Sequence, residues 1–179
     1  LKRKGVDTVV VDHHEIGPDG RPDCVALVNP KASGHSLEYL CAAGVVFKLA
    51  HALLKQRPLE KFDLKSVLDL VAVATISDIV PLVAENRLLV RHGLRKLEHS
   101  VRPGLRALLK LTGTEGRLSS ADIGFRIGPR LNAAGRMDQL EQALAILMTE
   151  CSNEALDLAD ELENFNRNRQ QLEQAIFAE

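Results

Sequence analysis

The stretch VDTVVVDHH, residues 6–14, decides how the rest of the sequence is interpreted. Its β-branched run follows Gly5 and stops at polar residues, a pattern that predicts a short strand buried on both faces, as in a parallel sheet. Asp12, His13 and His14 stand where the strand ends, and a turn rich in Gly, Pro and Asp follows. These three residues are either part of a metal site or the polar end of an ordinary strand.

The elements that follow suggest the end of an α/β domain and then a helical portion. A second short strand is predicted at residues 24–30, CVALVNP, where an Asn-Pro pair ends it. Residues 63–77 are apolar on almost all sides, which predicts a buried helix that delivers Asp78 just before Pro81. Strands first and helices afterwards are typical of this arrangement. Further helices are expected at residues 35–56, 85–100, 102–113, 139–150 and from 152 onward.

Composition narrows the class of protein. The chain has 179 residues, of which 45% are hydrophobic and 3% aromatic, and its formal net charge is −1. No apolar run approaches the roughly 18 residues of a membrane span, so we expect a cytoplasmic protein without membrane contact. Because there is no overall basic field, nucleic-acid binding has to come from a local cluster of cations. The few, widely spaced cysteines predict neither a disulfide framework nor a zinc site.

Asp78 is a second candidate for chemistry. A carboxylate at the end of an almost wholly apolar segment needs a cap, a cation or water, because burying a lone charge is costly. Asp78 is therefore either a cap on the following turn or a metal ligand. Carboxylate and imidazole ligands suit Mn²⁺ or Mg²⁺, and such ions activate water against phosphoesters. Because neighbours on an extended chain point to opposite sides, His13 and His14 are expected to have different roles.

A third candidate is the arginine-rich segment GFRIGPRLNAAGR, residues 124–136. Its glycines and proline predict a segment too broken for one long helix, with a backbone that a ligand can approach closely. Arginine forks match phosphate oxygens in a bidentate way, which favours anion binding over a solvated basic face. The side chains that would take part are Arg126, Arg130, Asn132 and Arg136.

Together these motifs resemble the DHH phosphoesterase superfamily in order and spacing, over nearly the whole chain. The Asp-His-His triplet at residues 12–14 belongs to the whole superfamily. The sequences SDIVPL at residues 77–82, with ENR after it, and GPRLNAAGR at residues 128–136 are specific to its branch of single-stranded-DNA exonucleases. The resemblance implies an α/β fold in which residues 1–150 are the C-terminal part of a DHH-type parallel-sheet catalytic domain. Residues 151–179 would then begin a long interdomain helix.

The resemblance also implies a role for each candidate residue. His13 and Asp78 would be metal ligands, His14 would face the scissile phosphate, and Asp12 would support the site. The path of the nucleic acid would be lined by Arg126, Arg130, Asn132 and Arg136, with Arg130 and Arg136 contacting phosphates.

Two motifs that the resemblance leads one to expect do not occur in the sequence. These are the family's initial His-x-Asp-x-Asp motif, with a further isolated Asp, and the Gly-Gly-His motif of the DHH-associated domain. We therefore expect a middle fragment of a longer protein, in which a two-metal site for Mn²⁺ or Mg²⁺ is incomplete. Such a fragment is expected to bind metal weakly or not at all, and not to hydrolyse DNA.

The function expected of the parent protein is metal-dependent 5′ to 3′ hydrolysis of single-stranded DNA in recombination and repair. The parent is expected to be a monomer, with a helicase or a single-strand-binding protein as partner. Heptad-type spacing after Ser152 predicts a seam through which the fragment could self-associate. Two alternatives stay open. One is a related DHH phosphoesterase acting on oligonucleotides, cyclic dinucleotides or pyrophosphate, and the other is a non-catalytic DNA-replication scaffold.

Overall fold

The structure of the chain is a computed structural model with two compact units, Leu1–Val90 and Arg91–Glu179. The border between them lies inside helix α3 (Ala84–Leu97), and each unit has its own hydrophobic core. The residues described are 2–114, 116–136 and 139–178, with the backbone alone for Lys2, Arg136 and Ala178.

The first unit contains a parallel two-stranded sheet, as the sequence predicts. A 3₁₀ turn, η1 (Lys2–Lys4), precedes β1 (Val9–Val11), which pairs with β2 (Ala26–Val28) so that Val10 lies opposite Leu27. Residues 12–25 form the crossover that parallel strands require. The prediction of burial on both faces is wrong for this chain, because Val9 and Val25 remain exposed on a sheet only two strands wide.

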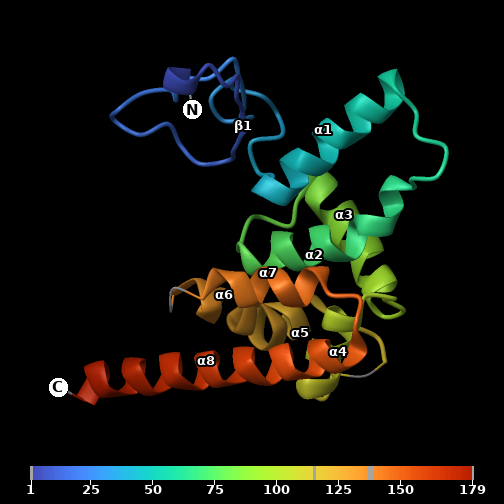
Figure 1. Cartoon of the computed structure of the whole chain (residues 1–179), viewed down its shortest axis with the longest axis vertical. Helices are drawn as coiled ribbons and strands as arrows, with labels where there is room; N and C mark the ends of the chain where they lie inside the picture. Colours follow the sequence, from blue (N-terminus) through green and yellow to red (C-terminus); the bar gives the residue numbers. More distant parts are fainter. Residues whose placement is uncertain (1, 115, 137–138, 179) are drawn as a thin grey trace. The chain divides into compact units, whose positions relative to one another are not determined.

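Helix α2 is the buried helix that the sequence predicts. A 3₁₀ turn, η2 (Leu64–Val67), leads into α2 (Leu68–Ser77), which packs against α1 (Ala42–Gln56). Figure 1 shows these helices in cyan and green. Because α2 is apolar on nearly every side, it lies at the centre of this unit rather than on its surface. The buried apolar residues of the unit are Leu40, Cys41, Val45, Val71, Ala72, Val73, Ile76 and Val90.

Helix α1 is shorter than the helix predicted at residues 35–56. The chain ahead of it forms turns in which the His35 ring accepts a hydrogen bond from the Leu37 N–H at 3.2 Å. The side-chain amide of Asn86 donates to the Tyr39 carbonyl at 2.8 Å, so that carbonyl is satisfied outside a helix. These contacts with other parts of the unit delay the start of α1 to Ala42.

The second unit is helical, and its longest element is α8 (Ser152–Ala178). Figure 1 shows α8 in red, lying alongside the shorter helices, and it packs against α4 (Pro103–Leu111), α6 (Gly128–Arg136) and α7 (Leu140–Met148). In the first half of its predicted heptad seam, Ala155 and Leu162 are buried within the unit and Leu158 is half-buried. The seam is exposed only in the last turns. No helix in the described ranges has the length and apolarity needed to cross a membrane.

The arginine-rich segment is more regular than its glycines and proline suggest. Helical backbone continues from α5 (Ser120–Asp122) through a π-helical stretch, η3 (Ile123–Ile127), into α6. In the wider turn the Gly128 N–H donates to the Ile123 carbonyl, five residues back. Pro129 has no N–H and its ring crowds the preceding turn, and a wider turn relieves this crowding. The expectation of a segment too broken for one long helix is thus wrong about the continuity of the backbone, although the helix changes pitch within the segment.

Helix α4 approaches α7 at Gly104. A Cβ atom built there would lie 1.7 Å from the Ile146 carbonyl oxygen, which no real contact allows. Gly104 and Ile146 are both buried, so the helices could separate only by opening the core of the unit.

We therefore expect Gly104→Ala to lower the free energy of unfolding of the second unit by about 3 kcal/mol or more, because overpacking forces backbone shifts. Urea denaturation followed by circular dichroism measures the change. Gly17→Ala is the matched control, since its Cβ would meet open space. Equal stability of the two variants would contradict the close approach of α4 and α7.

Candidate functional site

The Asp-His-His triplet lies where β1 ends. The Asp12 N–H still donates to the Val28 carbonyl of β2 at 3.1 Å, and the chain then leaves the extended conformation. As a result the rings of His13 and His14 lie with their centroids 4.2 Å apart. The expectation that the two rings point to opposite sides is therefore wrong, because it assumes that the strand continues. The two histidines nevertheless have different partners.

His13 faces the Asp78 carboxylate. Its Nε2 atom lies 3.4 Å from Asp78 Oδ2, with 12% of the histidine side chain and 40% of the aspartate side chain exposed. Two neighbouring ligands of one octahedral ion, each about 2.1 Å from it, stand roughly 3 Å apart. The spacing and the nitrogen and oxygen donors thus fit a common Mn²⁺ or Mg²⁺ ion. Within the described residues, no group of three or more His, Cys, Asp or Glu residues could hold a metal ion.

Asp78 owes its position to a strained turn at the end of α2. Its N–H donates to the Ala74 carbonyl at 3.0 Å, so the residue is the C-cap of α2, which differs from the cap on the following turn that the sequence suggested. The next residue, Ile79, has a φ of 57°, which a β-branched residue rarely adopts. Such strain persists only where the surroundings enforce it. Here the side-chain amide of Asn86 donates to the Pro81 carbonyl at 2.9 Å and holds the turn.

His14 is oriented by Asp12. The His14 Nδ1 atom lies 2.8 Å from Asp12 Oδ1, while most of the histidine side chain is exposed. Burial by itself raises the pKa of Asp12, but hydrogen bonds from the His14 ring and from the backbone of His13 and His14 outweigh it. The pKa of Asp12 is therefore held below its ordinary value. An ionised carboxylate can only accept, so His14 Nδ1 is the donor and Nε2 is left for another partner.

Asn29 is a positioning residue that the sequence interpretation missed. It is buried, its amide nitrogen donates to the His14 carbonyl at 2.9 Å, and its oxygen accepts from the N–H groups of Lys31 and Ala32. The end of β2 is thereby attached to the triplet at the end of β1. The signal in the sequence was the Asn-Pro pair, which was interpreted only as the end of a strand.

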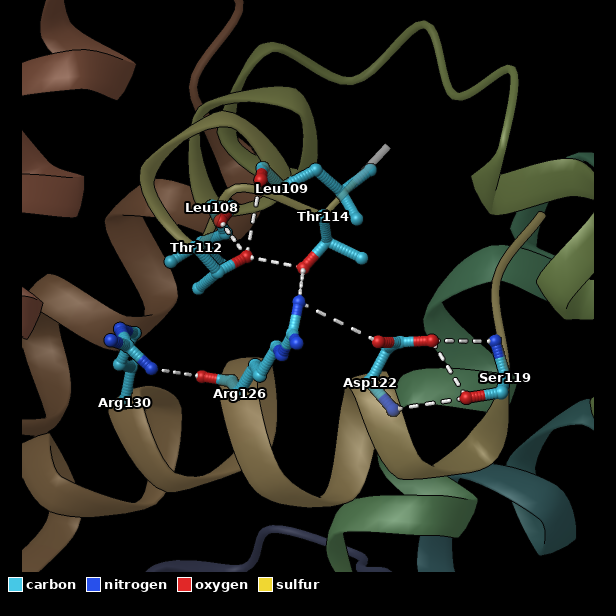
Figure 2. Close-up of polar contacts among 8 residues, drawn as sticks. All are labelled: Leu108, Leu109, Thr112, Thr114, Ser119, Asp122, Arg126 and Arg130. Atoms are coloured by element: carbon cyan, nitrogen blue, oxygen red, sulfur yellow. Dashed lines mark hydrogen bonds and ion pairs between the residues drawn. The ribbon is translucent and has the colours of Figure 1, made fainter. Parts of the chain in front are cut away.

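In the second unit, Arg126 is held by a polar network that Figure 2 shows. Its Nη1 atom donates to the Thr114 hydroxyl at 3.4 Å and lies 3.8 Å from Asp122 Oδ1. Hydrogen bonds from the hydroxyl and N–H of Ser119 lower the pKa of Asp122, and the charge of Arg126 lowers that pKa further. The Arg126 side chain stays 51% exposed, so its guanidinium is oriented and still open to solvent.

Arg130 is used differently from Arg126. Its Nε atom lies 2.6 Å from Glu163 Oε2, and each of the two side chains is only 16% exposed. Its Nη1 atom donates to the Arg126 carbonyl (Figure 2). Glu163 also pairs with Arg167 at 2.9 Å, so one carboxylate of α8 joins two arginines. Arg130 therefore connects α6 to α8, a structural role that the sequence pattern does not reveal.

The remaining predicted residues lie on α6. Asn132 is exposed there, two residues after Arg130. The side chain of Arg136, predicted to contact phosphate, lies outside the described residues. The structure therefore brings together Asp12 with His14 and His13 with Asp78 in the first unit, and Arg126 with Arg130 in the second.

Comparison with known proteins agrees with this fold. Residues 1–75 match the model of the DHH family, N-terminal domain. The chain is 44% identical over 174 residues to the single-stranded-DNA-specific exonuclease RecJ of Bacillus subtilis, covering 96% of this chain and 21% of that relative. It superposes on RecJ of Thermus thermophilus in complex with Mn²⁺ with a TM-score of 0.86 at 37% identity, covering 97% of this chain and 26% of the other. The Mg²⁺ complex of that protein gives a TM-score of 0.82.

Residues 1–75, which carry the parallel sheet and the Asp-His-His triplet, are thus similar to the N-terminal domain of the DHH family. Over nearly its whole length the chain is similar to the RecJ exonucleases, as 36% identity to the Escherichia coli protein also indicates. It spans about a fifth to a third of the length of the curated relatives.

We expect Asn29→Ala to lower the free energy of unfolding of the first unit by about 2 kcal/mol, because buried partners lose their hydrogen bonds. Thermal or urea unfolding of the chain measures the loss. Asn168→Ala, on the exposed side of α8, removes an amide of the same size and is expected to cost nothing. If both variants unfold like the original chain, Asn29 does not hold the triplet.

Proposed function

We propose that the whole protein to which this sequence belongs is a metal-dependent exonuclease that hydrolyses single-stranded DNA from the 5′ end in recombination and repair. The convergence of His13 and Asp78 from different elements at 3.4 Å is the observation that carries the proposal. A cap alone would not require an imidazole nitrogen opposite the Asp78 carboxylate. The identity to exonucleases whose names specify single-stranded DNA supports the substrate.

His13 and Asp78 would hold an Mn²⁺ or Mg²⁺ ion of a two-metal site whose other ligands lie elsewhere in the whole protein. When bound, such ions polarise the phosphate and activate water. His14 faces the substrate with its Nε2 atom, because Nδ1 is occupied by Asp12. In the protonated ring, Nε2–H donates to a phosphate oxygen and stabilises negative charge on it. Asp12 fixes the orientation of the ring through its contact with Nδ1.

The arginine-rich segment would bind the phosphates of the strand. Arg126 is the member best suited to this, because it is oriented by Asp122 and Thr114 and remains half exposed. We also propose Arg130, Asn132 and Arg136 as lining residues, with Arg130 acting through the orientation of α6 as well. Binding through phosphates makes the affinity fall as salt concentration rises.

The organisation and partners of the whole protein are proposals of the same kind. Residues 1–150 would be the C-terminal part of its catalytic domain, and residues 151–179 the start of the helix to a further domain. A helicase or a single-strand-binding protein would deliver the strand, and action on chromosomal DNA implies the cytoplasm. Self-association is restricted to the exposed last turns of α8, which present Leu172, Ile176 and Phe177.

Replacing His13 or Asp78 by alanine in the whole protein is expected to reduce manganese-dependent digestion of single-stranded DNA by at least a hundredfold. The loss of a ligand weakens metal binding and misplaces the ion. Release of nucleotides from a 5′-labelled or a 3′-labelled oligonucleotide measures both the rate and the polarity.

His92→Ala is the matched control, since His92 is exposed on α3 and has no assigned role. Undiminished digestion by both site variants would disprove the assignment. Faster turnover of dinucleotides, cyclic dinucleotides or pyrophosphate than of long strands would favour the related DHH phosphoesterase activity instead. Binding of DNA without any hydrolysis by the original protein would favour a scaffold.

The two arginines are expected to respond differently to substitution. Arg126→Ala should weaken the binding of single-stranded DNA roughly tenfold with little loss of stability, because it removes a phosphate contact. Arg130→Ala should lower the free energy of unfolding by about 2 kcal/mol, because Glu163 loses a partly buried cation. Fluorescence anisotropy with a labelled oligonucleotide, and urea denaturation of the same variants, separate the two effects. Equal effects on both readouts would contradict this division of roles.

A further inference from the structure

A pocket on the second unit has no role in the functions considered above. It has a volume of about 380 Å³ and lies between α4 and the beginning of α8. This volume is within the range of small-molecule sites, which runs from about 300 to 1,000 Å³. The residues that line it are Pro103, Arg106, Ala107, Leu109, Lys110, Thr114, Ser152 and Leu156.

Both charged side chains that line the pocket are positive. Arg106 and Lys110 are four residues apart on α4, so both side chains belong to one face of that helix. None of the described residues lining the pocket is acidic. Arg106 and Lys110 are exposed, and no ion pair between either of them and another described residue is present. Two cations without a carboxylate in the same concave surface favour an anion.

The uncharged residues that line the pocket indicate what else the bound anion could contain. Ser152 adds a hydroxyl group that can donate to a phosphate oxygen, whereas Thr114 donates its hydroxyl proton to Thr112, whose own proton goes to backbone carbonyls. Pro103, Ala107 and Leu156 add apolar surface on which a sugar or a base can lie. A ligand with a phosphate at one end and an apolar ring at the other matches both kinds of wall.

Thr114 connects this pocket to the arginine network. It lines the pocket, and its hydroxyl accepts the hydrogen bond from Arg126 and lies 2.8 Å from the Thr112 hydroxyl (Figure 2). Arg126 and the two pocket cations therefore border the same threonine. A strand whose phosphate contacts Arg126 has a second cationic site within reach on the same unit.

We propose that this pocket binds a phosphate-bearing nucleotide, with Arg106 and Lys110 on the phosphate and the apolar wall under the sugar or base. Binding of a polynucleotide strand in this pocket rests on the proposed function, whereas binding of a free nucleotide does not. In the strand-binding case the pocket is an additional subsite on the second unit, and His13 and Asp78 of the first unit are not part of it.

The test compares the chain with its Arg106→Ala/Lys110→Ala variant by fluorescence anisotropy, with a labelled oligo(dT) in EDTA so that no hydrolysis contributes. The variant is expected to bind roughly tenfold more weakly, and the slope of log affinity against log salt should shrink by about 0.7 for each lost phosphate contact. The matched control is Arg91→Ala/Arg95→Ala, which removes two cations at the same spacing from the exposed side of α3. Arg106→Lys/Lys110→Arg keeps both charges and should retain most of the affinity.

Competition with dTMP, inorganic phosphate and polyglutamate identifies the source of the anion. Displacement by dTMP at concentrations similar to those of oligo(dT) nucleotides assigns the pocket to a free nucleotide, and displacement by oligo(dT) alone assigns it to a strand. Equal losses in the two alanine variants, no loss in either, or displacement by polyglutamate as effective as by oligo(dT) would overturn the proposal. Digestion by the whole protein tests the proposed function separately, because His13 and Asp78 are unchanged in these variants.

Discussion

Helix α2 is apolar on nearly every side, and this property governs where the rest of the first unit can lie. An element of this kind has to be surrounded, so α1 packs against it and the buried residues of the unit gather around it. Its C-terminal end then brings Asp78 to the place where β1 ends, opposite His13. The strained φ of Ile79 is tolerated because Asn86 holds the turn that follows. A hydrophobic constraint thereby positions a pair of polar ligands.

In the second unit, several arginines lie close together, and each of them needs a polar partner. Arg130 and Arg167 share the Glu163 carboxylate, whereas Arg126 rests between Asp122 and Thr114. The pairs differ in burial, and burial separates structural arginines from those that can meet a ligand. A partly buried pair joins α6 to α8, and an exposed, oriented guanidinium remains available to an anion. The same residue type in one short motif thus serves two purposes.

A comparison of predicted and observed positions shows which features of the fold can be predicted from sequence patterns. The two strands, the buried α2 and the long α8 were predictable, because each is encoded by local periodicity and composition. Asn29 was not, because its role depends on a carbonyl fifteen residues away along the chain. The predicted start of α1 was also wrong. The side-chain amide of Asn86 in α3 donates a hydrogen bond to the Tyr39 carbonyl, which therefore needs no partner within a helix. The continuity of helical backbone through Gly128 and Pro129 depends on a π turn that propensities do not describe.

By itself the sequence determined which residues could carry chemistry: Asp12, His13, His14, Asp78 and the arginines of residues 124–136. Motif spacing also determined the family resemblance, which the comparisons bear out. Only the tertiary structure decided that His13 faces Asp78, that Asp12 binds His14, and that Arg130 faces Glu163 while Arg126 stays open. The physical reason is that residue type and local periodicity are properties of short segments. Distance and burial arise when separate segments pack together, and these two quantities decide whether a charged side chain is a ligand or a structural partner.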